Sequence, residues 1–147
     1  MNKRGFTLME LMITIGIMAI LMAFATPALV QWRQSAQIKE VARDILTGLR
    51  QARDMAVTSS STVTAVIDLD NHQLVYGGMT RTLTPQVPLE ARVKVNKDDD
   101  PPWATTGTKE TRFHPQGNAS NTLFIRVNGD DNLEVKIEFE ATGRARL

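Results

Sequence analysis

Apolar residues dominate the start of the chain, where the run from Phe6 to Val30 contains a single charged side chain, Glu10. A helix needs about 20 apolar residues to cross the hydrocarbon core of a bilayer, so this run is long enough to span one. Lys3 and Arg4 precede the run, and basic residues tend to stay on the cytoplasmic side of a membrane segment. We therefore expect a single-pass anchor, with the rest of the chain on the other side of the membrane.

Helical periodicity continues beyond this run as an apolar stripe with spacings of three and four residues. The stripe consists of Ile38, Val41, Ala42, Ile45, Leu49, Ala52 and Ala56. It predicts one helix from about Thr7 to Val57, apolar all round in its first half and packed by one face on a domain in its second half. Pro27 should bend this helix, because proline removes a backbone hydrogen bond and clashes with the preceding turn.

A polar segment at 58–61 ends the helical pattern, and period-two alternation follows. The predicted strands are 62–69, 73–76, 91–96, 123–127 and 133–139. Within 91–96, Val93 and Val95 are expected on one face. Asn128-Gly129 between the last two strands is a strong hairpin signal. The fold class is therefore α+β, a long helix packed on a small antiparallel sheet domain.

Composition excludes several classes of function. The chain has 17 basic and 16 acidic side chains, a formal net charge of +1 and no cysteine. Disulfides and cysteine-based metal or redox sites are therefore excluded, and no bulk charge indicates a polyanionic partner. His72 and His114 have no spacing typical of a ligand pair, and no nucleophile–base arrangement or phosphate loop is present. We expect that the protein has no catalytic residue and no cofactor, and that it is not an enzyme.

The aspartates Asp98, Asp99 and Asp100 precede two prolines and match no calcium-loop spacing. We expect a solvated acidic loop there and no metal site.

Two ordinary explanations of the N-terminal run compete with a specialised one. A secretory signal peptide has a shorter apolar region followed by small residues at a cleavage site. The end of this run, Phe24-Ala25-Thr26-Pro27-Ala28, does offer small residues. A plain single-pass anchor is the second explanation. Glu10 argues against both, because a carboxylate inside a membrane segment is costly and usually has a partner.

The segment Lys3-Arg4-Gly5-Phe6-Thr7-Leu8-Met9-Glu10 resembles the processing site of type IV pilins and type II secretion pseudopilins. The resemblance implies a type IV pilin fold, removal of leader residues 1–5 by prepilin peptidase between Gly5 and Phe6, and N-methylation of Phe6. It also implies that residues 6–30 form the membrane anchor and filament core. Residues 31–58 would then form the amphipathic half of the helix, and residues 59–147 the globular domain. Pro27 falls where these proteins commonly bend. The partners implied are other pilins, and the location is the inner membrane with a periplasmic domain, then a filament.

Glu10 is explained by this resemblance. Cleavage creates an ammonium group at Phe6, and a filament brings one subunit's N-terminus near Glu10 of another. Such a pair offsets the burial of both charges. We expect Glu10→Ala to leave membrane insertion intact and to impair assembly.

The C-terminus carries a second resemblance. Phe113-His114-Pro115-Gln116-Gly117, a hairpin and a closing Gly-Arg-x-Arg are similar to the GspH/FimT branch of minor pilins. In FimT-like members the closing motif contributes to binding DNA during uptake, which places DNA-binding roles on Gly143, Arg144 and Arg146. Arginines two apart on a strand lie about 6.5 to 7 Å apart, close to the spacing of adjacent phosphates, and guanidinium groups suit phosphate oxygens. The alternative is a short edge strand with two solvent-facing arginines.

The segment 123–147 holds four basic and five acidic residues, so a DNA-binding patch needs further cations. The candidates are Arg81, Arg92, Lys94, Lys97 and Arg112. Three functions stay open: a FimT-like, DNA-binding minor pilin, a GspH-like minor pseudopilin with a structural or priming role in type II secretion, and a minor pilin that serves assembly alone.

Overall fold

A computed structural model describes residues 6–84, 86–96, 98, 100–127, 135–140, 142 and 145–146, without the side chains of 25–28, 135–139 and 145–146. The leader residues and Gly143 and Arg144 therefore lie outside the described residues. The chain divides into two compact units, residues 1–36 and 37–147, and each is treated by itself below. Helix α1 runs from Leu8 to Thr58, close to the predicted bounds. Pro27 lies within it, and the bend at that position stays a prediction.

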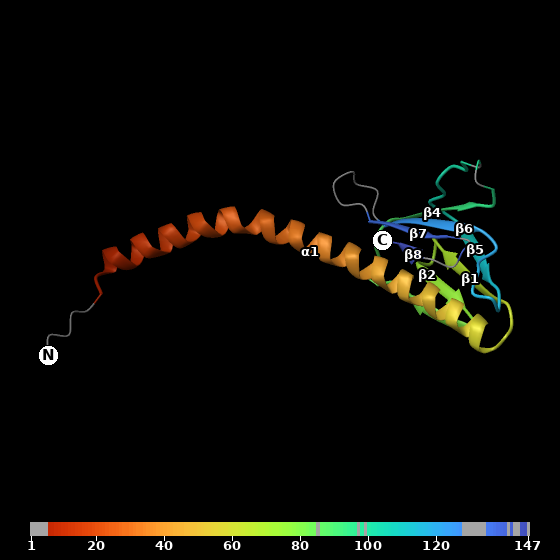
Figure 1. Cartoon of the computed structure of the whole chain (residues 1–147). Coiled ribbons are helices and arrows are strands. Elements are labelled where there is room, and N and C mark those ends of the chain that lie inside the picture. The colour runs from red at the N-terminus through yellow and green to blue at the C-terminus, as the bar shows by residue number, and fades with distance from the viewer. Residues whose placement is uncertain are drawn as a thin grey trace. The chain divides into compact units, whose positions relative to one another are not determined.

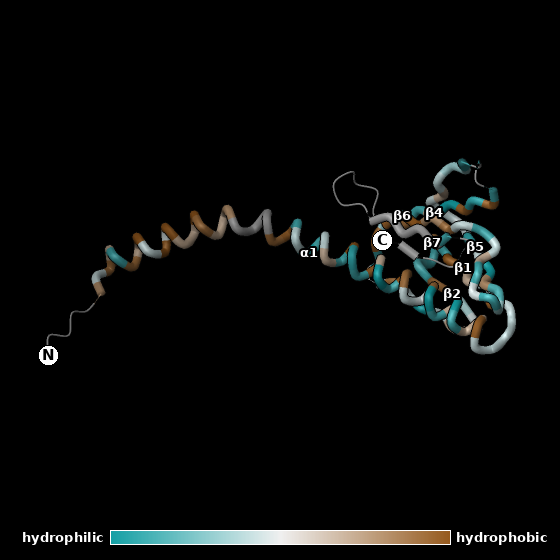
Figure 2. Tube along the Cα trace, in the orientation of Figure 1, coloured by the Kyte–Doolittle hydropathy of each residue, from teal (hydrophilic) through white to brown (hydrophobic). Residues whose placement is uncertain are grey.

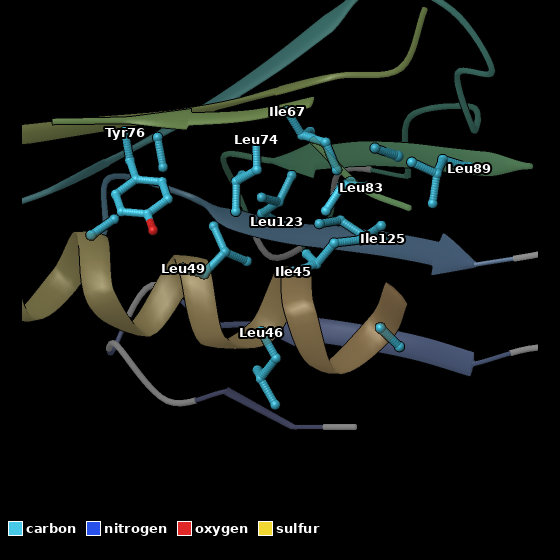
Figure 3. Packing of buried hydrophobic residues seen from close by; sticks show 14 of the residues in the cluster. Ile45, Leu46, Leu49, Ile67, Leu74, Tyr76, Leu83, Leu89, Leu123 and Ile125 are labelled. Carbon is cyan, nitrogen blue, oxygen red and sulfur yellow. The ribbon is translucent and has the colours of Figure 1, made fainter. Parts of the chain in front are cut away.

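In the second unit, α1 buries the stripe that the periodicity predicts. Hydropathy along the tube changes from an apolar start to an alternation of polar and apolar positions (Figure 2). Ile45 and Leu49 point toward Leu74, Leu123 and Ile125 (Figure 3). Leu46, which lies outside the predicted stripe, is also buried, at 5% exposed, and widens the packed face.

The β-strands form two antiparallel sheets (Figure 1). Sheet A has the order β3-β2-β1-β5, and its strands are β1 (Val63–Asp68), β2 (Gln73–Tyr76), β3 (Met79–Thr82) and β5 (Thr108–Phe113). Sheet B has the order β4-β6-β7-β8, and its strands are β4 (Leu89–Lys94), β6 (Thr122–Val127), β7 (Val135–Phe139) and β8 (Ala145–Arg146).

Alternate residues of the central strands enter one core with the helix stripe. In β1 the inward residues are Val63, Ala65 and Ile67, and in β6 they are Leu123, Ile125 and Val127. The described core begins at Ile38, so it lies entirely within the unit 37–147. The α+β class and the packing of the helix on an antiparallel sheet domain are confirmed.

Some strand predictions need correction. The strand predicted at 91–96 begins at Leu89 and ends at Lys94, and its buried residues are Leu89 and Ala91. Val93 is only partly buried, and Val95 lies beyond the strand, 72% exposed. Strands β3 and β5 were not predicted, because polar residues dominate them.

Candidate functional site

The first candidate site lies at the start of α1. The backbone N–H of Glu10 donates to Thr7 Oγ1 at 3.2 Å, and Glu10 Oε2 accepts from the Thr7 backbone N–H and hydroxyl, both at 3.1 Å. This reciprocal arrangement is a capping box, which satisfies helix donors that otherwise lack partners. Glu10 therefore has a local partner, Thr7, within the single chain. The Thr-x-x-Glu spacing could have indicated this from sequence.

The apolar part of α1 around this cap is exposed in the chain by itself. Leu8, Met9, Met12 and Phe24 are among its large exposed side chains. By length and composition α1 is the one helix in the described residues that could cross a membrane. Phe6, the expected first residue after cleavage, is exposed, whereas Gly5 lies outside the described residues.

The second candidate site is the face of sheet B turned away from the core. Strands β4 and β6 are paired so that Glu90 lies opposite Arg126 and Arg92 lies opposite Phe124. Since their neighbours Leu89, Ala91, Leu123, Ile125 and Val127 point into the core, these residues take the other side of each strand. We call Arg92, Lys94, Trp103, Phe124 and Arg126 the cationic face.

Aromatic rings and cations alternate on the cationic face. The guanidinium carbons of Arg92 and Arg126 lie 4.6 and 4.3 Å from the ring centroid of Trp103. Arg92 and Lys94 lie 5.3 and 5.7 Å from the ring centroid of Phe124. Contacts at these distances are attractive because the face of an aromatic ring carries negative potential. They hold three cations close together on two neighbouring strands.

Two carboxylates balance part of this charge. Glu90 Oε2 accepts from Arg126 Nη1 at 3.1 Å, and Asp100 Oδ1 accepts from Arg92 Nη1 at 2.6 Å. Lys94 Nζ lies 3.2 Å from the same Asp100 oxygen. The hydrogen bond from Lys94 and the charges of Arg92 and Lys94 hold the pKa of Asp100 below its usual value. The aspartate loop is therefore tied to the cationic face by Asp100 and is not merely a solvated segment.

The described residues show no arrangement suited to a metal. No group of three or more His, Asp or Glu side chains among them could hold an ion. Asp99 lies outside the described part of the chain.

The C-terminal motif reaches the same sheet. Strand β8 pairs with β7 so that Arg146 lies opposite Glu138, and β7 pairs with β6 so that Glu138 lies opposite Phe124. Directly opposite positions in antiparallel strands share a face of the sheet. Position 146 therefore belongs to one cross-strand row with Glu138, Phe124 and Arg92. Gly143 and Arg144 lie outside the described residues.

The structure places two of the other candidate cations, Arg81 and Arg112, away from this row. Arg81 donates to Asp44 of α1 at 2.8 Å, so it ties sheet A to the helix. Arg112 lies on β5 of sheet A and pairs with Glu110 at 2.9 Å. Lys97 is outside the described residues. Of the candidates, the fold places Arg92 in the row and Lys94 beside it on the cationic face. Arg126 also lies on that face, although sequence reasoning did not select it.

The Phe113–Gly117 motif has a structural role. Phe113 is fully buried, and the chain then turns with hydrogen bonds from the backbone N–H groups of His114 and Gly117. Gly117 has a φ of +81°, and its carbonyl accepts a 2.8 Å hydrogen bond from Arg53 Nε of α1. The motif thus fastens the end of β5 to the helix and contributes no group to the cationic face.

Comparison with solved structures identifies the class of fold. The type IV minor pilin FimU of Pseudomonas aeruginosa is similar in structure, with a TM-score of 0.54 over 76% of this chain and 88% of that chain, at 16% sequence identity. At this identity the similarity shows the fold alone, which is the type IV pilin fold. No curated protein sequence matches the chain.

Comparison with protein families identifies the particular family. Residues 1–26 match the prokaryotic N-terminal methylation motif, and residues 41–143 match the family described as type II transport protein GspH. Because the second match covers well over half of the chain, the chain belongs to the GspH family of type IV pilin-like proteins. It is a minor pilin or pseudopilin of the type IV pilus or type II secretion type. Proteins of this kind are generally structural and not enzymatic, and the apolar helix and family indicate membrane anchoring.

Proposed function

We propose that this chain is a minor pilin of a type IV pilus that binds extracellular DNA without sequence preference for uptake in natural transformation. Prepilin peptidase cleaves between Gly5 and Phe6, and Phe6 is then N-methylated. Residues 6–30 anchor the subunit in the inner membrane with its globular domain in the periplasm, and then form part of the filament core. Glu10 pairs with the N-terminus of a neighbouring subunit, and Pro27 bends the helix. Gly143, Arg144 and Arg146 contribute to DNA binding.

The observation that carries this proposal is the cross-strand row of sheet B. Strand pairing aligns position 146 of the Gly-Arg-x-Arg motif with Phe124 and Arg92. The cationic face holds Lys94 and Arg126 beside that row. Two arginines alone would make a weak binding site. Together with the three cations and two aromatic rings of the cationic face, they have the composition of a surface that binds nucleic acid.

The chemistry favours contact with phosphates. Guanidinium groups donate forked hydrogen bonds that match phosphate oxygens, and they carry no information about base sequence. Glu90 and Asp100 pair with cations of this face, and position 138 belongs to the same cross-strand row, so few net positive charges are available. Binding should therefore be weak, independent of sequence and strongly dependent on salt.

A GspH-like minor pseudopilin of a type II secretion system is the second candidate. The family description supports it, because the matched family is described as type II transport protein GspH. This function needs the assembly segment around Glu10 and makes no use of the cationic face. A minor pilin that serves assembly alone would share that property.

Removing the two tail arginines tests the proposal. Residues 34–147, which include the whole described core, would be titrated into labelled duplex DNA at several salt concentrations, with and without Arg144→Ala/Arg146→Ala. We expect weaker binding in the variant. The slope of log affinity against log salt should be smaller by about 0.9 for each phosphate that the variant no longer neutralises.

A variant with the same change in charge provides the control. Arg43 and Arg50 are exposed on α1, so Arg43→Ala/Arg50→Ala should change affinity much less. Undetectable binding at low salt, or equal losses in the two double variants, would remove the DNA-binding function and leave the pseudopilin or assembly role.

A further inference from the structure

Two cations of the cationic face converge on one oxygen atom. Arg92 Nη1 lies 2.6 Å and Lys94 Nζ lies 3.2 Å from Asp100 Oδ1. The side chains of Arg92 and Lys94 are about one-fifth exposed, at 20% and 22%, whereas that of Asp100 is 75% exposed. The carboxylate therefore lies on the solvent side of a pair of cations that the sheet holds in place.

The local structure explains why Asp100 reaches this position. Arg92 and Lys94 are two apart on β4, so they share a face of the sheet. Beyond Lys94 the chain turns back, and Ala104 exchanges two backbone hydrogen bonds with Ala91, at 2.9 and 3.0 Å. This return places Trp103 over Arg92 and leaves Asp100 at the outer edge of the cation pair.

The cation pair is itself supported by other contacts. Arg92 lies against the rings of Trp103 and Phe124, and Lys94 lies near the Phe124 ring. A guanidinium has five donors and an ammonium has three, so one carboxylate oxygen uses a small part of their capacity. Removal of the Asp100 carboxylate would therefore leave both cations positioned by the sheet and the rings.

We propose that Arg92 and Lys94 form a phosphate-binding subsite for the DNA backbone, and that Asp100 occupies this subsite until a phosphate displaces it. The inference rests on the proposed DNA-binding function and deepens it. A phosphodiester oxygen carries the same kind of charge as the Asp100 oxygen and is recognised by the same donors. Position 146 lies in the same cross-strand row as Arg92, so one strand of DNA could contact the tail and the subsite together.

Displacement makes Asp100 a competitor of DNA. An exposed ion pair contributes little to stability, so the carboxylate should give way readily while still lowering affinity. Removing its charge is therefore expected to strengthen binding. A gain in affinity is a useful test because a variant that fails to fold cannot produce one.

The experiment compares Asp100→Asn with Asp98→Asn in the full chain, solubilised in non-ionic detergent, by fluorescence anisotropy with a labelled DNA duplex. Both variants remove one negative charge from the same loop, and within the described residues no salt bridge involves Asp98. We expect Asp100→Asn to bind DNA about two- to fivefold more tightly than wild type, from the strength of exposed ion pairs. Asp98→Asn should change affinity by less, and adding Lys94→Gln to Asp100→Asn should remove the gain.

The outcomes separate this inference from the proposed function. Equal affinities for Asp100→Asn and Asp98→Asn would overturn the subsite, and they would leave the proposed function in place if Arg144→Ala/Arg146→Ala still weakens binding. No DNA binding by any of these proteins would overturn both. A gain seen with phosphatidylglycerol vesicles and not with DNA would also overturn the subsite, because the cations would then serve a lipid surface.

Discussion

Two features of Gly117, its backbone conformation and its close contact with Arg53, disfavour any side chain at this position. Its φ of +81° is unfavourable for residues with a Cβ, and a Cβ at this position would lie 3.0 Å from Arg53 Nη2. We expect Gly117→Ala to lower the free energy of unfolding by about 1–3 kcal/mol, from backbone strain and a weakened Arg53 hydrogen bond. Urea unfolding of residues 34–147 measures this change.

Substitution of Gly107 tests the effect of backbone strain alone. Gly107 has a φ of +79°, and a Cβ there would meet no atom within 4 Å. Gly107→Ala should therefore be the less damaging of the two substitutions. Equal losses of stability would contradict a role for the Arg53 hydrogen bond.

Single residues were predictable where a local rule applies. The helix stripe was predicted because each of its members follows from spacing alone, and Leu46 was missed because it lies at the margin of that stripe. Val95 was placed wrongly because alternation does not reveal where a strand ends. Arg126 was not selected because its value to the cationic face depends on Trp103, which is distant in sequence.

The last residue of β1, the half-buried Asp68, orders the turn between β1 and β2. Asp68 accepts hydrogen bonds from the side chain and the backbone of Asn71 and from the backbone of Asp70. Hydrogen bonds from the side chain and then the backbone of Asn71 lower the pKa of Asp68. Since the folded pKa is lower than the unfolded value of about 3.9, this stabilisation is present above about pH 4 and is lost as pH falls through the folded pKa.

Asp68→Asn should keep an acceptor oxygen in the turn and remove the titration. We expect the variant to lose less stability than wild type between about pH 5 and pH 3, by urea unfolding of residues 34–147. Asp54→Asn, an exposed change on α1, removes the same charge and is the matched control. Parallel pH profiles for wild type and Asp68→Asn would contradict the turn's contribution.

Elements were predictable when their pattern had one clear period. Helix α1 and the strands β1, β2 and β6 show such a pattern. Strand β5 reads Thr-Lys-Glu-Thr-Arg-Phe, and only Thr111 and Phe113 within it are buried, because it lies at the edge of sheet A. An edge strand can remain polar on most positions, so periodicity alone does not reveal it.

At the scale of the whole molecule, strand order decides which distant residues meet. Sheet B places β4 beside β6 although β5 intervenes in the chain, and this brings Arg92 and Lys94 next to Phe124 and Arg126. The sequence offered five further candidate cations without any means to choose among them. Non-local pairing brings Arg92 and Lys94 together on sheet B and places Arg81 and Arg112 elsewhere, and such pairing lies beyond any local rule.

Assembly is the remaining property of the whole chain, and the role proposed for Glu10 concerns it. We expect Glu10→Ala to enter the membrane as wild type does and to appear in filaments at much lower levels. Its carboxylate is the partner proposed for the N-terminus of a neighbouring subunit, and removing one partner of a buried ion pair leaves the other charge unpaired. Immunoblots of membrane fractions and of sheared filaments measure the two steps separately.

The capping box requires a second variant, because Glu10 also serves its own helix. Thr7→Ala removes the side-chain contacts of the cap and keeps the carboxylate. If the neighbouring subunit is the partner that matters, Thr7→Ala should assemble better than Glu10→Ala, because its carboxylate remains available to an incoming ammonium group. Equal defects would assign Glu10 to helix capping, and normal incorporation of Glu10→Ala would contradict any role in assembly.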